Sequence, residues 1–289
     1  MELEGVYLAS GRWDIECLPA DGGRIAALRF DGRDLLTAAP DRFIPPDEPP
    51  GRYETRPVYG YDDCFPSVDA CTYPARDRFQ VPDHGELMWL PWDVRVEEGR
   101  LVCRTACQLL PAVFRRTLSP DGSALRWDYE IENASDEPLP CLHVPHALMP
   151  PQEIVGLRLP ECGAVHDESQ EGVPLWTGGD DPAGHLLAAA PGTAHMLLLR
   201  GCRQGRAEVA FRDGPTIEIA WPADLLPTLG IWWNNAAWPA QKGLGRRECA
   251  LEPMPGPASS LATSHRAGQC LVIPPGGHLS WSITWTVRP

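Results

Sequence analysis

The stretch Arg247–Pro257 carries a carboxylate in a setting that suits acid–base chemistry. Its sequence, RECALEPMPGP, is typical of a buried strand that ends in a turn rich in proline and glycine, and Glu252 lies within it. Glutamate is rarely buried unless it is paired or functional, and partial burial raises a carboxyl pKa toward neutral pH. Glu252 is therefore a candidate general base. The structural alternative is a side chain that caps the turn or pairs with Arg246 or Arg247.

Histidines occur inside two further apolar stretches. His84 stands in PDHGELMWLPW, where Gly85 permits close approach of the backbone to a ligand. His143 and His146 occur in LPCLHVPHALMPP, and their odd spacing makes them face opposite ways on a regular strand, although Pro145 interrupts regular pairing. We expect one of these two to face a cleft and the other to be structural. For His84, the alternative is a ring held by a turn carbonyl.

Carboxylate, indole and amide side chains form a set that suits a sugar ligand. Asp62 and Asp63 interrupt the apolar run YGYDDCFPSV and can accept hydrogen bonds from sugar hydroxyls, or else cap a turn. Trp232, Trp233 and Asn234 place a flat apolar face beside an amide. That combination suits the C–H faces and hydroxyl edges of a carbohydrate. For one of the two tryptophans the alternative is packing in the core.

The sequence predicts no bound cofactor and no metal ion. It contains no GxGxxG, no GxxxxGK followed by serine or threonine, no HExxH and no GxSxG. A metal site made from His84, one of the two later histidines and Glu252 matches no familiar ligand spacing. Cys103 and Cys107 lie on one alternating strand at about 13 Å, too far apart to share a zinc ion.

The elements that must position these residues are strands. Apolar and polar residues alternate with period two through most of the chain, most clearly in Leu125–Asn133 and His278–Val287. The Asp-Gly pairs at 31–32 and 213–214 each separate two apolar runs and predict tight hairpin turns. Pro40–Pro57 is polar and proline-rich and predicts a long surface loop. The pattern predicts on the order of fifteen or more short strands, hence an all-β sandwich.

Length and charge limit the classes of protein that the chain can represent. Without an internal repeat, a linker or a shift in composition, we expect residues 1–289 to form a single domain. The net charge of −14 repels phosphate backbones and anionic lipids, so neither nucleic acid nor a membrane is an expected partner. The N-terminus shows no secretion signal, so we expect a cytoplasmic protein whose ten cysteines are reduced thiols.

Five stretches, taken in order, resemble the galactose mutarotase-like superfamily, which comprises the aldose 1-epimerases and their uncharacterised relatives. They are the hairpin Asp21–Leu36, the FP stretch Gly60–Val68, the HG…PW stretch Asp83–Trp92, the second-histidine stretch Leu142–Leu148, and Trp232–Gly256 with its WWN and ALEPMPG. The resemblance covers nearly the whole chain. It implies an all-β fold, a β-supersandwich of antiparallel sheets.

The resemblance also implies a sugar mutarotase, an isomerase that interconverts the α and β anomers of an unphosphorylated aldose. In the family pattern, Glu252 is the general base that removes the proton of the anomeric hydroxyl. His146 is the general acid that protonates the ring oxygen, and His84 binds and polarises near that oxygen or a neighbouring hydroxyl. This chemistry needs no cofactor, and the implied partner is a small-molecule sugar.

Two departures from the family pattern bear on the substrate. The second histidine is followed by ALMP at 147–150, where the full aldose 1-epimerases have an aromatic-Phe-Asn-Leu run. Met88 stands where the hexose-6-phosphate relatives have the arginine of HGFAR, which argues against a phosphorylated substrate. Two alternatives stay open. One is a non-catalytic carbohydrate-binding protein on the same fold, and the other is a glycoside hydrolase or lyase using Asp62 or Asp63 with Glu252.

Overall fold

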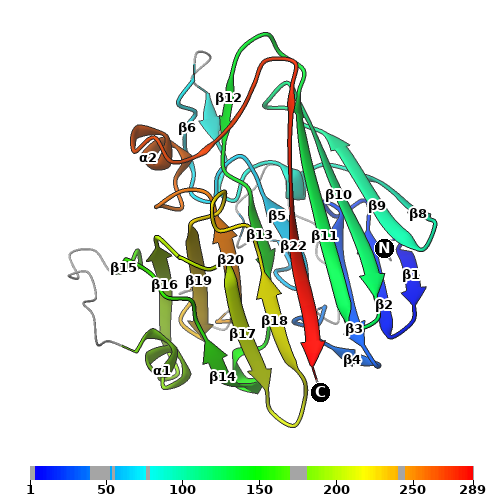
Figure 1. The fold of residues 1–289 in the computed structure, drawn as a ribbon, viewed down its shortest axis with the longest axis vertical. Coiled ribbons are helices and arrows are strands. Elements are labelled where there is room, and N and C mark those ends of the chain that lie inside the picture. The colour runs from blue at the N-terminus through cyan, green and yellow to red at the C-terminus, as the bar shows by residue number, and fades with distance from the viewer. Residues whose placement is uncertain are drawn as a thin grey trace.

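The chain folds almost entirely into antiparallel strands, so the predicted all-β class is confirmed (Figure 1). The computed structural model describes residues 4–39, 53, 56–75, 79–169, 181–239 and 245–288. Those residues contain twenty-two strands and two short α-helices. Most of the predicted surface loop Pro40–Pro57 lies outside the described residues, whereas Tyr53 lies within them.

Eight strands form the largest sheet, in the order β14-β17-β18-β22-β11-β10-β9-β8. They are β8 (Asp93–Glu97), β9 (Arg100–Ala106), β10 (Ala112–Asp121), β11 (Ala124–Asn133), β14 (Ile154–Arg158), β17 (Arg206–Phe211), β18 (Thr216–Ala220) and β22 (His278–Arg288). β17 and β18 form the hairpin predicted at 213–214. On β11 and β22, Trp127 opposes Ile283 and Tyr129 opposes Trp281, and all four are buried. The two alternating stretches of the sequence thus build one continuous apolar face.

Six strands form a second sheet, in the order β1-β2-β3-β5-β13, with β4 paired to β3. They are β1 (Val6–Ser10), β2 (Trp13–Leu18), β3 (Arg24–Phe30), β4 (Arg33–Asp34), β5 (Tyr61–Cys64) and β13 (Val144–Ala147). β3 and β4 form the hairpin predicted at 31–32, where both turn residues have positive φ. Tyr61 of β5 packs against Trp127 of β11 with ring centroids 4.6 Å apart, so the apolar faces of the two large sheets meet in the core.

Four strands form a third sheet, in the order β15-β16-β19-β20. They are β15 (Ala164–Asp167), β16 (Thr193–Arg200), β19 (Thr228–Asn235) and β20 (Arg247–Met254). Met149, just after β13, and Cys249 on β20 exchange backbone hydrogen bonds of 2.7 and 2.9 Å. β13 and β20 therefore lie side by side near the centre of the molecule (Figure 1). This junction brings the second-histidine stretch next to the strand that holds Glu252.

Short elements complete the described part of the chain. They are the strand pairs β6 (Cys71–Thr72) with β7 (Gln80–Val81) and β12 (Leu139–Cys141) with β21 (Leu271–Ile273), and the helices α1 (Pro182–Leu187) and α2 (Leu261–Arg266). The ten cysteines are all free. Among the described residues, no helix has the length and apolar character needed to cross a membrane.

Candidate functional site

A cavity of about 510 Å³ opens where the four-stranded sheet meets β13. Its lining residues are Tyr53, Val58, Val68, Asp69, His84, His146, Leu148, Glu168, Ser169, Ala194, Met196, Trp232, Ala237, Trp238, Arg246, Glu248, Glu252 and Ser259. The fold thus brings His84, His146 and Glu252, which are far apart in the sequence, into one hollow.

The four-stranded sheet turns one face toward this cavity because alternate residues of a strand point the same way. Glu248 and Glu252 lie on that face of β20, and Trp232 and Met196 lie on the same face of β19 and β16. Gly230 is the direct partner of Glu252 on β19, and a Cβ there would lie 3.4 Å from the Glu252 Cβ. The glycine therefore leaves room around the carboxylate.

Glu252 and His146 face each other in the cavity. Glu252 Oε1 lies 3.7 Å from His146 Nε2, and the two residues are 2% and 5% exposed. Burial raises the pKa of Glu252, and the charges of His146 and His84 oppose that rise only in part. Burial by itself lowers the pKa of His146, but the bond to Asp62 and the nearby carboxylates outweigh it and raise that pKa. A proton acceptor and a proton donor are thus within reach of one small group.

Asp62 fixes the ring of His146 from behind. The two residues are direct partners on β5 and β13, and His146 Nδ1 donates to Asp62 Oδ1 at 3.0 Å. Arg24 is fully buried, with Nη1 3.3 Å from Asp62 Oδ2. Burial alone raises the pKa of Asp62, but the His146 hydrogen bond and the Arg24 charge hold it well below its usual value. The expected sugar contact by Asp62 is therefore corrected, because its buried carboxylate serves His146.

Asp63 points the opposite way, into the core between the sheets. Its carboxylate accepts hydrogen bonds from Tyr61 at 2.5 Å, His143 Nε2 at 2.9 Å and Arg116 at 2.5 Å. Because Asp63 and His143 are buried away from the cavity, the expected sugar contact by Asp63 is corrected and His143 is the structural histidine of its stretch. The glycoside hydrolase alternative requires Asp62 or Asp63 as a second carboxylate beside Glu252, and neither of them lines the cavity.

A strained turn carries His84 into the cavity. His84 has φ 60° and Gly85 has φ 74°, both in the left-handed region. A Cβ on Gly85 would lie 1.9 Å from the carbonyl oxygen of Phe65, so the close approach that this glycine permits is to the backbone and not to a ligand. The His84 side chain is 19% exposed, and its Nδ1 lies 3.0 Å from Asp83 Oδ1.

The ring of Tyr53 contacts both histidines, and no local pattern in the sequence marks it as a site residue. Its ring stacks on His84 with centroids 3.7 Å apart and planes 5° apart, and its hydroxyl lies 3.0 Å from His146 Nδ1. Burial raises the pKa of Tyr53 well above its usual value, so the hydroxyl stays protonated. The polar and proline-rich composition around Tyr53 predicts a surface loop, and nothing in that composition indicates that one aromatic side chain of the stretch is buried.

Indole rings line the side of the cavity formed by the four-stranded sheet. Trp232 faces the cavity and Trp233 faces the core with 3% exposure, so the expectation that one of the pair packs internally is confirmed. Asn234 is fully buried, and its Oδ1 accepts hydrogen bonds from the backbone N–H groups of Ala237 and Trp238. The expected sugar contact by Asn234 is corrected, because its amide is used to hold the turn that carries Trp238.

The cavity has an excess of negative charge. Asp69, Glu168, Glu248 and Glu252 line it, whereas Arg246 is the single guanidinium among its described lining residues. Arg246 Nε lies 3.6 Å from Glu248 Oε1, so that positive charge is largely neutralised. Such a field disfavours an anionic ligand.

Cys64, His84 and His146 are the described residues best placed to serve as metal ligands. Each offers one donor atom, and the three atoms lie within 4.8 Å of one another. A tetrahedral zinc ion with bonds of about 2.0–2.3 Å needs ligand atoms about 3.3–3.8 Å apart, which is shorter than the 4.8 Å within which these three atoms lie. Burial, reinforced by Asp62 and Glu252, raises the pKa of the Cys64 thiol well above its usual value.

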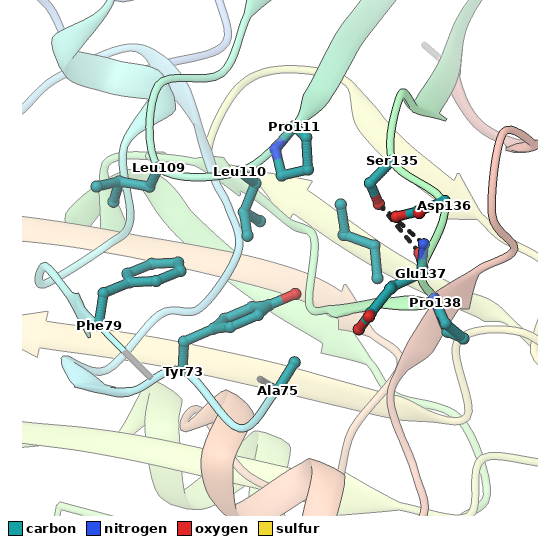
Figure 2. Close-up of a pocket in the computed structure, with 11 residues that line it drawn as sticks. Tyr73, Ala75, Phe79, Leu109, Leu110, Pro111, Ser135, Asp136, Glu137 and Pro138 are labelled. Carbon is teal, nitrogen blue, oxygen red and sulfur yellow. Dashed lines mark hydrogen bonds between the residues drawn. The ribbon is translucent and has the colours of Figure 1, made fainter. Parts of the chain in front are cut away.

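A second cavity, of about 290 Å³, shares no lining residue with the first (Figure 2). Tyr73 and Phe79 stack in its wall with ring centroids 4.8 Å apart. Ser135 and the backbone of Glu137 are joined by hydrogen bonds at its other end (Figure 2). Its described lining residues include no histidine, so it lacks the carboxylate–imidazole pair of the larger cavity.

Several solved structures share this architecture over their full length. The Slr1438 protein from Synechocystis sp. PCC 6803 matches 100% of this chain and 96% of its own, with a TM-score of 0.76 and 18% identity. A candidate aldose 1-epimerase from Escherichia coli K12 matches 99% of both chains, with a TM-score of 0.72 and 14% identity. A galactose mutarotase-like protein from Lactobacillus casei ATCC 334 matches 99% of this chain and 100% of its own, with a TM-score of 0.69 and 13% identity. This chain has the galactose mutarotase-like fold.

The galactose mutarotase-like fold explains why the five resembling stretches occur in their order along the chain. In sequence, the chain matches no protein-family model and no curated protein. At identities this low the likeness extends to the fold, and one fold supports many activities. The activity has to be inferred from the side chains of the cavity.

Proposed function

We propose that the protein is a sugar mutarotase, an isomerase that interconverts the α and β anomers of an unphosphorylated aldose. One observation carries this proposal, namely the 3.7 Å between Glu252 Oε1 and His146 Nε2 in a cavity of about 510 Å³. The anomeric oxygen O1 and the ring oxygen O5 are bonded to the same carbon, so a base and an acid that act on them must converge in this way. The likeness to structures described as galactose mutarotase-like supports the same activity.

Ring opening removes one proton from the sugar and supplies another. Glu252 takes the proton of the anomeric hydroxyl, the O1–H electron pair forms the C1=O1 bond, and the C1–O5 bond breaks. Its electrons pass to O5, which takes a proton from His146 Nε2. After rotation about C1–C2, neutral His146 removes the O5 proton and Glu252 returns its own to O1, so the ring closes on the other face.

The neighbours of the two groups suit these roles. The hydrogen bond to Asp62 occupies His146 Nδ1 and leaves Nε2 free to act on the sugar. The His84 ring lies with its centroid 5.4 Å from that of His146, close enough to polarise an adjacent hydroxyl. Trp232 supplies a flat apolar surface for a C–H face of the sugar.

The charge of the cavity supports a substrate without phosphate. Asp69, Glu168 and Glu248 line it together with the base, and Arg246 is paired with Glu248. A sugar phosphate would bring about two further negative charges into this field, and the described lining residues offer no unpaired guanidinium or ammonium to receive them. Neutral aldoses carry no such cost.

The test is anomer exchange followed by NMR on a panel of neutral aldoses, with wild-type protein and Glu252→Gln. The variant should lose the enzyme-dependent rate by about 10²-fold or more while it still binds sugar, because the amide keeps the shape of the side chain but cannot take a proton. Glu97→Gln, at an exposed position of β8, is the matched control and should leave the rate unchanged.

Two outcomes contradict the proposal. Exchange at the wild-type rate by Glu252→Gln would make the assignment of the base wrong. Sugar binding without faster exchange of any aldose would instead favour the non-catalytic carbohydrate-binding alternative, since a binder needs the indoles of the cavity and not the acid–base pair.

A further inference from the structure

Trp238 lies on the rim of the candidate active-site cavity, with 47% of its surface exposed. Its ring belongs to the lining of the cavity, and aromatic side chains in such a lining offer apolar contact area to a ligand. Ring opening as described above uses Glu252, His146 and His84 and leaves Trp238 without a role.

The buried side-chain amide of Asn234 makes three hydrogen bonds to the backbone of the turn that carries Trp238. Asn234 Oδ1 accepts from the N–H groups of Ala237 at 3.0 Å and Trp238 at 2.9 Å, and Asn234 Nδ2 donates to the carbonyl of Trp238 at 2.8 Å. The N–H of Arg246 donates to the same carbonyl at 3.0 Å. The exposed ring is therefore presented from a rigid turn, which lowers the entropy lost when a ligand stacks on it.

Glu248 ties this turn to the rest of the indole wall. It is 3% exposed, and its Oε1 accepts from Asn234 Nδ2 at 2.8 Å and from Trp232 Nε1 at 3.4 Å. The ring of Trp232 and the turn of Trp238 are thus held by one buried carboxylate. Glu252 lies on the same face of the same strand, so the wall and the proposed base keep a fixed relation.

The wall is longer than one sugar ring. Glu248 and Glu252 are four residues apart on β20, which is about 13 Å along a strand. Trp232 faces Ala250 between them, and the turn of Trp238 lies beyond Glu248. The cavity of about 510 Å³ is also within the range of about 300–1,000 Å³ that encloses drug-sized ligands, which are larger than one hexose.

We propose that the cavity accepts the reducing end of a disaccharide or longer oligosaccharide, with the second pyranose ring stacked on Trp238. The first ring lies on Trp232 with its anomeric carbon between Glu252 and His146. This placement of the reducing end rests on the proposed mutarotase activity.

Trp238→Ala, compared with wild type on glucose, maltose and cellobiose, tests the proposal. The wild type should show a kcat/KM for anomer exchange of at least one disaccharide about tenfold above that for glucose, because aromatic contact contributes about this factor. Trp238→Ala should lower the disaccharide value about tenfold and leave glucose within about twofold, and Trp238→Phe should keep most of it. Tyr7→Ala, which removes a side chain 66% exposed on β1, is the matched control and should change neither.

The proposal is overturned if disaccharides are exchanged no faster than glucose, or if Trp238→Ala lowers both alike. If no sugar is exchanged at all, the mutarotase proposal fails, and calorimetric binding of maltose and cellobiose decides the subsite alone. A dissociation constant that Trp238→Ala raises about tenfold then supports the stacking site, and equal or absent binding overturns it. A thermal unfolding curve for each variant shows that the turn still folds.

Discussion

Asp62 Oδ1 lies 3.0 Å from His146 Nδ1, and the two residues are direct partners across β5 and β13. Arg24 supports the carboxylate from the other side and also donates to Asp21 at 2.6 Å, and Arg56 donates to the same aspartate at 2.5 Å. Behind the proposed acid there is therefore a buried network of alternating charges. It orients the imidazole and favours its protonated form, so its contribution can be changed without removing the ring.

Asp62→Asn should lower kcat about 10²-fold with little change in KM, because the amide keeps a hydrogen bond to Nδ1 but no longer favours the imidazolium. The diagnostic readout is the pH profile. Loss of the carboxylate lowers the pKa of His146, so the alkaline limb of the rate should move to lower pH. Glu130→Gln, on the solvent side of β11, serves as control. A drop in rate with an unshifted alkaline limb would mean that Asp62 acts by structure alone.

The pKa shifts of the acid and the base predict a bell-shaped pH profile for the wild type. Burial raises the pKa of Glu252, so its loss of basicity on acidification begins above the ordinary glutamate value of about 4.3. Asp62 raises the pKa of His146 against the effect of burial, so its loss of acidity begins above the ordinary histidine value of about 6.5. Initial exchange rates between pH 4 and 9 measure both limbs, and an alkaline limb centred below about 6.5 contradicts the assignment of the acid.

The three residues predicted to form the site can be picked out from the sequence because each stands in a recognisable local pattern. Glu252, His146 and His84 each stand out as polar groups inside apolar runs, and the fold brings all three into one cavity. The Asp-Gly turns and the alternating strands of the core likewise follow from period and turn chemistry within a few residues.

The expected sugar contacts of Asp62, Asp63 and Asn234 were wrong because the sequence does not show which side of a strand or turn faces the cavity. Asp62 and Asp63 are neighbours of the same type, yet alternation sends one behind His146 and the other into the core. Their partners Arg24 and Arg116 come from distant strands, and no local pattern signals such pairs. Asn234 looked like a ligand contact because its amide is polar and lies beside two tryptophans. The structure shows that this amide is instead hydrogen-bonded to the backbone of Ala237 and Trp238.

Anionic sugars should be poor substrates. The carboxylates of Asp69 and Glu168, which no described cation of the cavity lining pairs with, repel a phosphate or carboxylate group, so kcat/KM for glucose 6-phosphate or glucuronate should lie at least about tenfold below that for glucose. Added salt should narrow the gap, because screening weakens repulsion at the open side of the cavity. Glu168→Gln should also narrow it, with Glu161→Gln, an exposed position outside the cavity, as control. Equal turnover of neutral and anionic sugars would contradict this account of the cavity.

Asp63→Asn should destabilise the fold without acting on the cavity. Asp63 and Arg116 are both fully buried, so the variant leaves a guanidinium in the core without its carboxylate, at a cost of about 3–5 kcal/mol in the free energy of unfolding. Adding Arg116→Met removes the stranded charge and should restore most of the loss. Urea unfolding of the wild type and both variants measures this.

The stability lost in Asp63→Asn should depend on pH because Asp63 is paired with Arg116. Burial alone raises the pKa of Asp63, but Arg116 and the His143 hydrogen bond outweigh it, so the pKa is lower in the folded state than in the unfolded chain. The stabilisation is then complete above the unfolded value of about 3.9 and is lost as the pH falls through the folded value. The gap between wild type and Asp63→Asn should therefore be constant from pH 8 to pH 5 and shrink below about pH 4. A gap that instead widens on acidification would show that Arg116 is not the group that holds the carboxylate ionised.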